Sequence, residues 1–221
     1  MKHYFTRDWT IYLIRHGEST SNAGGVIGGE QASLTDKGVV QAKALNNYLQ
    51  QYPLPHAKIV CTSHLPRAMQ TALLISDGLR VSANEIIIDP RLCEIRRGEW
   101  DGLSQTQIYT PEQQKEFALY DMDFRSPGGE SMHDVGTRMR SWIYDLDVCA
   151  QRQQSNVSTV VAVTHGIATK VLLQRIFNLT PSYVWLVGME NTSVTKIRAT
   201  QRGWHLDYLN RTPHLADRGL I

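Results

Sequence analysis

The sequence predicts a single α/β domain with a largely parallel β-sheet and helices on both of its faces. Short apolar, β-branched runs alternate with stretches of helical periodicity along the chain. The 221 residues are enough for one full hydrophobic core. No internal repeat or linker divides them, so we expect residues 1–221 to form one domain.

The composition excludes several classes of protein. The formal net charge of +2 is too small for a general binder of nucleic acid or of a membrane surface. Three cysteines without a Cys-x-x-Cys spacing indicate neither a disulfide framework nor a cysteine zinc site. Without a secretion signal or a long apolar span, we expect a cytoplasmic protein with no nucleic-acid or membrane partner.

Six apolar runs bounded by glycine, proline and polar residues have the pattern of strands. The last has the weakest pattern. These runs are Thr10–Ile14, Lys58–Thr62, Glu85–Ile88, Thr159–Thr164, Ser193–Ala199 and Trp204–Leu209.

Three longer stretches have helical periodicity. The Thr35 hydroxyl can cap the first, and Pro66 suits the first turn of the second, which Gly78 is expected to end. The third carries an apolar stripe that we interpret as core. The expected helices run from Thr35 to Leu49, from Pro66 to Gly78, and from Ser131 to Leu146.

Residues 103–130 lack a clear period and are polar, with scattered aromatic side chains. Segments of this length without regular structure are uncommon in compact domains unless they serve a function. We therefore expect this segment to form a lid-like excursion over a functional site.

Two of the predicted strands run directly into a His-Gly pair, His16-Gly17 and His165-Gly166. Ligands of open α/β sheets bind at the carboxyl ends of the strands, so both imidazoles are expected at one place. The two glycines would let the backbone and a ligand approach closely. One histidine in this position would be weak evidence, but two in the same local context point to a site.

Arginines accompany these histidines. Arg15 places a planar, permanently charged guanidinium beside His16. Arg67 falls in the first turn of a helix that follows the second strand, where the helix dipole favours an anion. Each charge-assisted hydrogen bond from such an arginine contributes about 1.5–3 kcal/mol. The pattern predicts an anion site, with phosphate as the natural ligand.

A phosphate ester also needs a proton donor for its leaving alkoxide, and a carboxyl group can serve. Both Glu94 and Glu99 follow the third strand, and the residues alone do not choose between them. Ser19 and Asn22 lie in a glycine-rich loop after His16 that matches neither the Walker A nor the dinucleotide pattern.

In order along the chain, these blocks resemble those of the histidine phosphatase superfamily, the phosphoglycerate mutase-like proteins. The resemblance covers nearly the whole sequence. The matching blocks are Arg15-His16-Gly17-Glu18, Asn22, Leu34-Thr35-x-x-Gly38-x-x-Gln41-Ala42, Ser63-x-x-x-Arg67-Ala68-x-Gln70-Thr71-Ala72, Glu94-x-x-x-Gly98-x-Trp100-x-Gly102, Pro127-Gly128-Gly129-Glu130-Ser131 and Thr164-His165-Gly166.

The resemblance implies a role for each site residue. His16 would be the nucleophile that carries the phosphoryl group, and Glu94 the proton donor. No metal or other cofactor is implied. The remaining residues would hold the phosphoryl group, namely Arg15, Arg67 and His165, or line the pocket, namely Ser19, Asn22, Gly29 and Gly166.

The excursion before Pro127 is short, which favours a phosphatase acting on a small phosphorylated metabolite over a bisphosphoglycerate-dependent phosphoglycerate mutase. A catalytically silent module that binds a phosphorylated ligand is the alternative outside enzymes, and a homodimer is possible in either case. Arg96 and Arg97 depart from the family pattern, as does His64. The two arginines either recognise a carboxylated or multiply phosphorylated substrate or are simply solvated.

Overall fold

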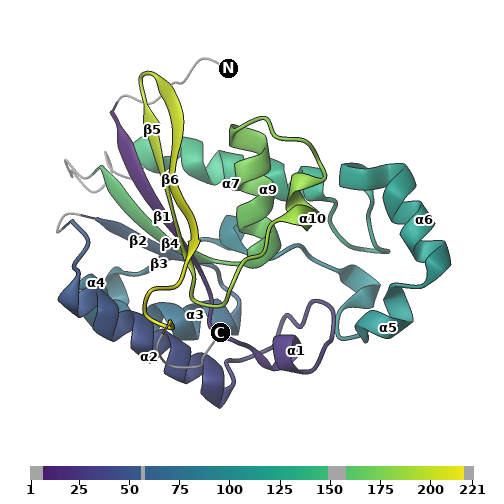
Figure 1. Cartoon of the computed structure of the whole chain (residues 1–221), viewed down its shortest axis with the longest axis horizontal. Coiled ribbons are helices and arrows are strands. Elements are labelled where there is room, and N and C mark those ends of the chain that lie inside the picture. Colours follow the sequence, from purple (N-terminus) through teal and green to yellow (C-terminus); the bar gives the residue numbers. More distant parts are fainter. Residues whose placement is uncertain (1–6, 56–57, 149–157, 217–221) are drawn as a thin grey trace.

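The computed structural model describes residues 7–55, 58–148 and 158–216. Its centre is one six-stranded sheet in the order β3-β2-β4-β1-β5-β6 (Figure 1). The four strands from β3 to β1 are mutually parallel, whereas β5 and β6 are antiparallel to their neighbours. The strands are β1 Trp9–Arg15, β2 Ile59–Thr62, β3 Ile87–Ile88, β4 Thr159–Thr164, β5 Val194–Thr200 and β6 Gly203–Arg211.

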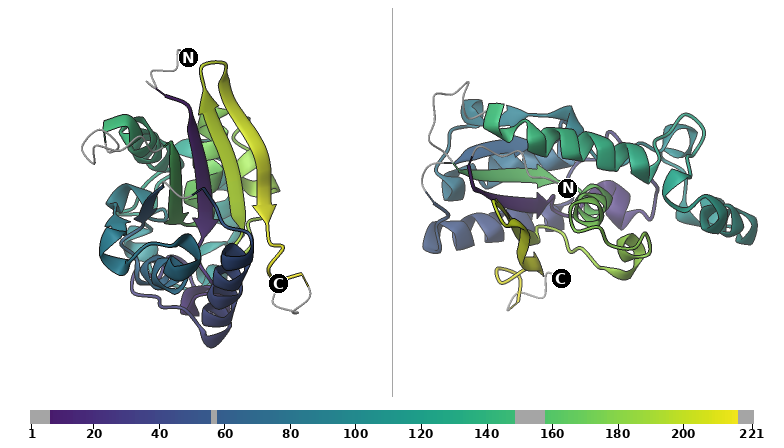
Figure 2. Two further views of the ribbon diagram at one scale, coloured as in Figure 1. Left: turned by 90° about the vertical axis from the view of Figure 1, so that its left-hand side faces the viewer. Right: turned by 90° about the horizontal axis from the view of Figure 1, so that it is seen from above.

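Helices cover both faces of this sheet (Figure 2). The α-helices are α1 Thr20–Ala23, α2 Asp36–Gln51, α3 Pro66–Leu74, α4 Ser76–Leu79, α5 Gln105–Ile108, α6 Pro111–Tyr120, α7 Met132–Tyr144, α9 Gly166–Ile176 and α10 Tyr183–Leu186. Short 3-10 helices are η1 Ala83–Glu85, η2 Pro90–Leu92, η3 Gly98–Trp100 and η4 Asp121–Asp123. The predicted α/β fold with a mostly parallel sheet is therefore confirmed.

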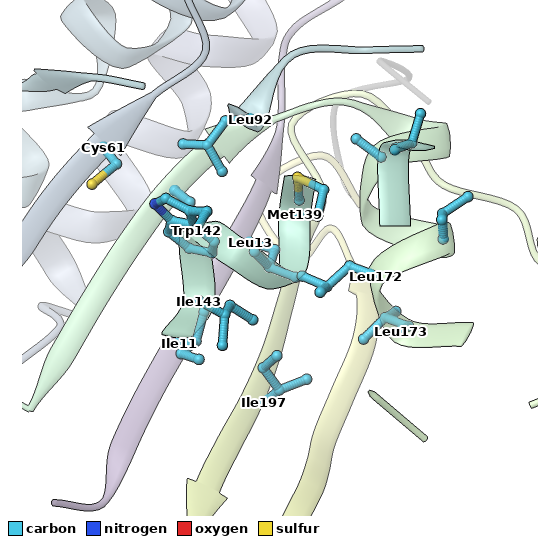
Figure 3. Packing of buried hydrophobic residues seen from close by; sticks show 14 of the residues in the cluster. Ile11, Leu13, Cys61, Leu92, Met139, Trp142, Ile143, Leu172, Leu173 and Ile197 are labelled. Carbon is cyan, nitrogen blue, oxygen red and sulfur yellow. The ribbon is translucent and has the colours of Figure 1, made fainter. Parts of the chain in front are cut away.

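Alternation along β1 divides the core into two layers. Ile11 and Leu13 pack with α7 and α9 on one face (Figure 3), whereas Tyr12 and Ile14 pack with α2, α3 and α4 on the other. Successive side chains of a strand point to opposite faces, so a strand buried on both faces is apolar throughout. The predicted core stripe of α7 is buried on the first face, including Trp142.

The predicted helix starts are confirmed by their caps. The Thr35 hydroxyl accepts a hydrogen bond from the Gly38 backbone N–H at 3.0 Å, and Ser131 forms a capping box with Asp134 at the start of α7. These bonds satisfy backbone donors that have no partner inside a helix.

One predicted helix end is wrong. Instead of a single helix ending at Gly78, α3 ends at Leu74, α4 follows, and Arg80 provides the left-handed cap with φ 55°. Gly78 is needed for packing, because a β-carbon there would lie 2.6 Å from the backbone oxygen of Asn46 in α2. The glycine signal was real, but it marks a close helix contact and not a helix end.

The segment predicted as a lid-like excursion contains α5, α6 and η4 and projects from the end of the sheet (Figure 2, teal). The sequence periodicity predicted neither helix. Helix α6 has no recognisable apolar stripe because it buries too little of its surface. Among the described helices, none is long and apolar enough to cross a membrane.

Candidate active site

The two His-Gly pairs meet at one edge of the sheet. Arg15 of β1 is in register with Thr164 of β4, so His16 and His165 follow side by side. Their ring centroids lie 4.9 Å apart, and both side chains are buried. This confirms the expectation that the parallel strands bring both imidazoles to the same place.

Hydrogen bonds orient the His16 ring and select its tautomer. Nδ1 lies 2.6 Å from the Gly17 backbone oxygen, so this nitrogen carries the proton and donates. Nε2 then holds a lone pair, and the Arg67 Nε–H donates to it at 3.3 Å. The arrangement leaves Nε2 as a nucleophile beside a guanidinium.

Both buried imidazoles are held neutral. Burial lowers the pKa of His16 well below its usual value, and the charges of Arg15 and Arg67 lower it further, against a smaller opposing effect of the Gly17 carbonyl. Burial likewise lowers the pKa of His165, followed by His16 and three arginines that include Arg138. Burial is therefore a larger cause of the lowered His16 pKa than the charges of the two arginines.

Two buried nitrogens beside His16 have no hydrogen-bond partner among the described residues: Arg15 Nε, which is a donor, and His165 Nδ1, which is a donor in the tautomer whose Nε2 accepts from the Ser63 hydroxyl. A buried unpaired donor costs about 1–3 kcal/mol, so these atoms suit an incoming oxyanion. The rest of each group is anchored: Arg15 Nη1 donates to the Met189 oxygen, and His165 Nε2 lies 2.9 Å from the Ser63 hydroxyl.

Glu94 is the carboxylate of this edge. Its oxygens accept hydrogen bonds from the backbone N–H groups of Ile167 and Ala168 at 3.1 and 3.0 Å, at the start of α9. Glu94 lines a cavity at this edge of the sheet, whereas Glu99 is exposed in η3 and lines neither this cavity nor the two beside it. The geometry favours Glu94 over Glu99 as the proton donor.

A cavity of about 160 Å³ opens at this edge. Its walls include exposed residues, so water can enter it. The residues predicted from the sequence that line it are Arg15, His16, Asn22, Arg67 and Glu94. Others that line it are Ser21, Val26, Ile27, Gly28, Ile95, Arg97, Gln105, Tyr109 and Ile167.

Three other residues predicted to line the pocket are not among those that line this cavity. Ser19 is fully buried and caps α1, where its hydroxyl donates to Asn22 Oδ1 at 3.0 Å. The Gly29 oxygen accepts from Arg67 Nη1 at 2.7 Å. A β-carbon on Gly166 would lie 3.6 Å from Arg15 Nε. These residues contact the residues that line the pocket.

Gly17 also has a different neighbour from the one expected. A β-carbon there would lie 2.5 Å from the Gly38 oxygen, and one on Gly38 would lie 2.0 Å from the Glu18 oxygen. The close approach that requires Gly17 is thus between the backbone after His16 and the first turn of α2.

A buried ion pair that the sequence argument missed supports the Glu94 segment. Arg138 of α7 donates to the backbone oxygens of Cys93 and Glu94 at 2.7 and 3.0 Å, and both oxygens of Glu130 accept from Arg138. Glu130 stands in a block that resembles the family, but the apolar stripe of α7 gives no sign of the role of Arg138. Contacts of a side chain with backbone carbonyl groups cannot be recognised from a sequence, because every residue has such a group.

Asn191 was also missed. Its Nδ2 donates to the His16 backbone oxygen at 3.0 Å, and the Thr192 N–H donates to the same oxygen. No pattern in this loop signals that role. Among the described residues no group of three or more His, Cys, Asp and Glu side chains is placed to hold a metal ion.

Comparison with known families bears directly on this site. Residues 11–212 match the model of the histidine phosphatase superfamily, branch 1. A protein of Erwinia tasmaniensis named "Probable phosphoglycerate mutase GpmB" is 31% identical over 218 residues, which are 95% of this chain and 96% of that protein. One of the same name from Serratia proteamaculans is 32% identical over 88% of this chain and 86% of its own length.

Solved structures of related proteins have the same fold. Mycobacterial glucosyl-3-phosphoglycerate phosphatase has a TM-score of 0.76 at 26% identity, covering 92% of this chain and 99% of its own. YhfR of Bacillus stearothermophilus has a TM-score of 0.77 at 27% identity, covering 93% and 98%.

Proposed function

Because the chain belongs to the histidine phosphatase superfamily, whose members are phosphatases and mutases, we propose that it is a phosphatase that hydrolyses a small phosphate monoester through phosphohistidine on His16. One observation carries this proposal: a neutral His16 Nε2 lies beside the Arg67 guanidinium in a cavity that water can enter. Such a nitrogen can attack phosphorus, and water can then cleave the product.

The first step transfers the phosphoryl group. His16 Nε2 attacks phosphorus in line, the Nε2–P bond forms, and the ester P–O bond breaks. Arg15, Arg67 and His165 Nδ1 donate to the phosphoryl oxygens, whose charge they stabilise in the transition state. Glu94 protonates the departing oxygen, since the leaving alkoxide is otherwise too basic.

The second step releases phosphate. Glu94, now a carboxylate, takes a proton from a water molecule that attacks the phosphohistidine, and His16 leaves as a neutral imidazole. Water entry separates a phosphatase from a mutase, which must shield its phosphohistidine. Exposed Asn22, Gln105 and Tyr109 on the cavity wall support hydrolysis. The alternative of a silent binding module is disfavoured by the complete set of reactive groups.

The test compares the protein with His16→Ala on a panel of phosphate esters, with and without bisphosphoglycerate. We expect hydrolysis to fall by on the order of 10³-fold or more in His16→Ala. Trapped phosphohistidine should be lost with it. His133→Ala, which removes an exposed imidazole from α7, is the matched control.

Hydrolysis that survives in His16→Ala would overturn the phosphohistidine route. Rapid isomerisation of phosphoglycerate that requires the bisphosphate would show a mutase. Inertness toward every ester would leave a binding role as the better account.

A further inference from the structure

Arg97 lies where the active-site cavity meets a second, smaller cavity. The second cavity has a volume of about 30 Å³ and shares Ile95, Arg97 and Tyr109 with the first. Its remaining wall consists of apolar side chains, which include Phe117 and Trp185, and of one carboxylate, that of Asp121. A ligand bound through its phosphoryl group at His16 would therefore extend toward Arg97.

The guanidinium of Arg97 is available to such a ligand. It has no hydrogen bond or ion pair with any residue in the described part of the chain, although it is half-buried. Its neighbour Arg96 differs: that side chain is 63% exposed and pairs with Glu130 at 3.1 Å. The structure thus separates the two arginines that the sequence treated together.

The charge of Arg97 serves a different part of the ligand from the charges at the nucleophile. The positive charges that lower the pKa of His16 are those of Arg15 and Arg67. These two side chains already flank the phosphoryl position, and Glu94 is the only carboxylate among the residues that line the cavity. Arg97 is therefore a cation on the wall of this cavity that forms no ion pair among the described residues, and the carboxylate that lines the second cavity is that of the exposed Asp121.

Aromatic side chains pack against one another beside Arg97. The Tyr109 and Phe117 rings lie 5.6 Å apart, and Phe117 meets Phe124 edge to face at 4.5 Å. Apolar walls lower the local dielectric and strengthen an ion pair formed against them. The small second cavity leaves room for only a short group beyond Arg97.

We infer that Arg97 determines specificity by binding a second anionic group, so that the preferred substrates are small phosphate monoesters whose alcohol portion carries a carboxylate or another phosphate. This inference rests on the proposed phosphatase function and adds a substrate class to it. The guanidinium fork matches either anion in a bidentate manner.

The test measures kcat/KM for three esters of equal chain length. Propyl phosphate has no second charge, phosphorylated hydroxypropanoate carries a carboxylate, and propanediol bisphosphate carries a second phosphate. The readout is the ratio of each charged ester to propyl phosphate. We expect Arg97→Gln to lower this ratio by about 10- to 100-fold, and Arg97→Lys to restore part of it. Arg96→Gln removes the same charge one residue away and should leave the ratio unchanged.

The outcomes separate the two claims. If the protein hydrolyses propyl phosphate and shows no preference for a charged ester, the inference fails while the phosphatase function stands. An unchanged ratio in Arg97→Gln, or an equal loss in Arg96→Gln, also overturns it. If no ester is hydrolysed, the proposed function fails and the inference falls with it. The two charged esters show which anion Arg97 prefers.

Discussion

Replacing Glu130 with glutamine is expected to lower the free energy of unfolding by about 3–5 kcal/mol, because it leaves the Arg138 guanidinium charged and without its counter-ion inside the protein. The side chains of Glu130 and Arg138 are 6% and 15% exposed, and two hydrogen bonds of 3.0 Å join them. Burial alone would raise the pKa of Glu130, but bonding to Arg138 holds it below its usual value. The carboxyl is thus ionised at neutral pH.

An exposed ion pair gives the matched control. Arg198 pairs with Asp207 and is 42% exposed, so Arg198→Gln should lower the free energy of unfolding far less than Glu130→Gln does. Urea unfolding at neutral pH, followed by circular dichroism, measures both. In a domain of this size the Tm of Glu130→Gln should fall by about 6–20 °C. Equal losses in the two variants would refute the argument from burial.

The same variant tests whether this ion pair positions Glu94. Arg138 binds the Glu94 backbone oxygen, so loss of its anchor should displace the proton donor. Hydrolysis of an alkyl phosphate should then fall by about tenfold more than that of a nitrophenyl phosphate, whose leaving group needs little protonation. An equal fall for both esters would show that Glu130 acts on stability alone.

Two further predictions concern the pH dependence of stability and the close packing of the backbone. Because the folded protein holds His16 and His165 neutral, the unfolded chain binds more protons below about pH 6.5, and the free energy of unfolding should fall as pH decreases from about 7.5 to about 5.5. Urea titrations should show a shallower slope in His165→Gln, and an unchanged slope would contradict this. Gly38→Ala should lower Tm through the clash at Glu18, whereas Gly188→Ala, with no atom within 4 Å of its new β-carbon, should not. Equal Tm values would refute the close-packing argument.

Local patterns identified most strands and the main helices. The side chains of β1 that alternate between the two faces and the apolar stripe of α7 are both buried against regular elements. On a regular element the buried positions recur at a fixed spacing, which can be recognised in the sequence. Prediction failed where burial is slight or the cause is distant. Helix α6 lies on the outside of the molecule and lacks a stripe, and the contact that requires Gly78 comes from Asn46 in another helix.

The residues of the candidate site likewise fall into those that the sequence could predict and those that it could not. Reactive side chains stand in short motifs at strand ends, so His16 and Arg67 could be found from their neighbours in the chain, whereas the choice of Glu94 over Glu99 depended on the family resemblance. Residues that act through backbone carbonyls or buried ion pairs, such as Arg138 and Asn191, could not be found, because their partners lie far away in sequence.

By itself the sequence determined the sheet, the two histidines at the ends of adjacent parallel strands, and the family. Tertiary structure alone decided how these residues work. The tautomer of His16 and its lowered pKa depend on burial and on atoms brought in from α3. The tertiary structure also distinguished Arg96, which pairs with Glu130, from Arg97, which lines the cavity. Such differences arise from packing between distant segments, which no local pattern records.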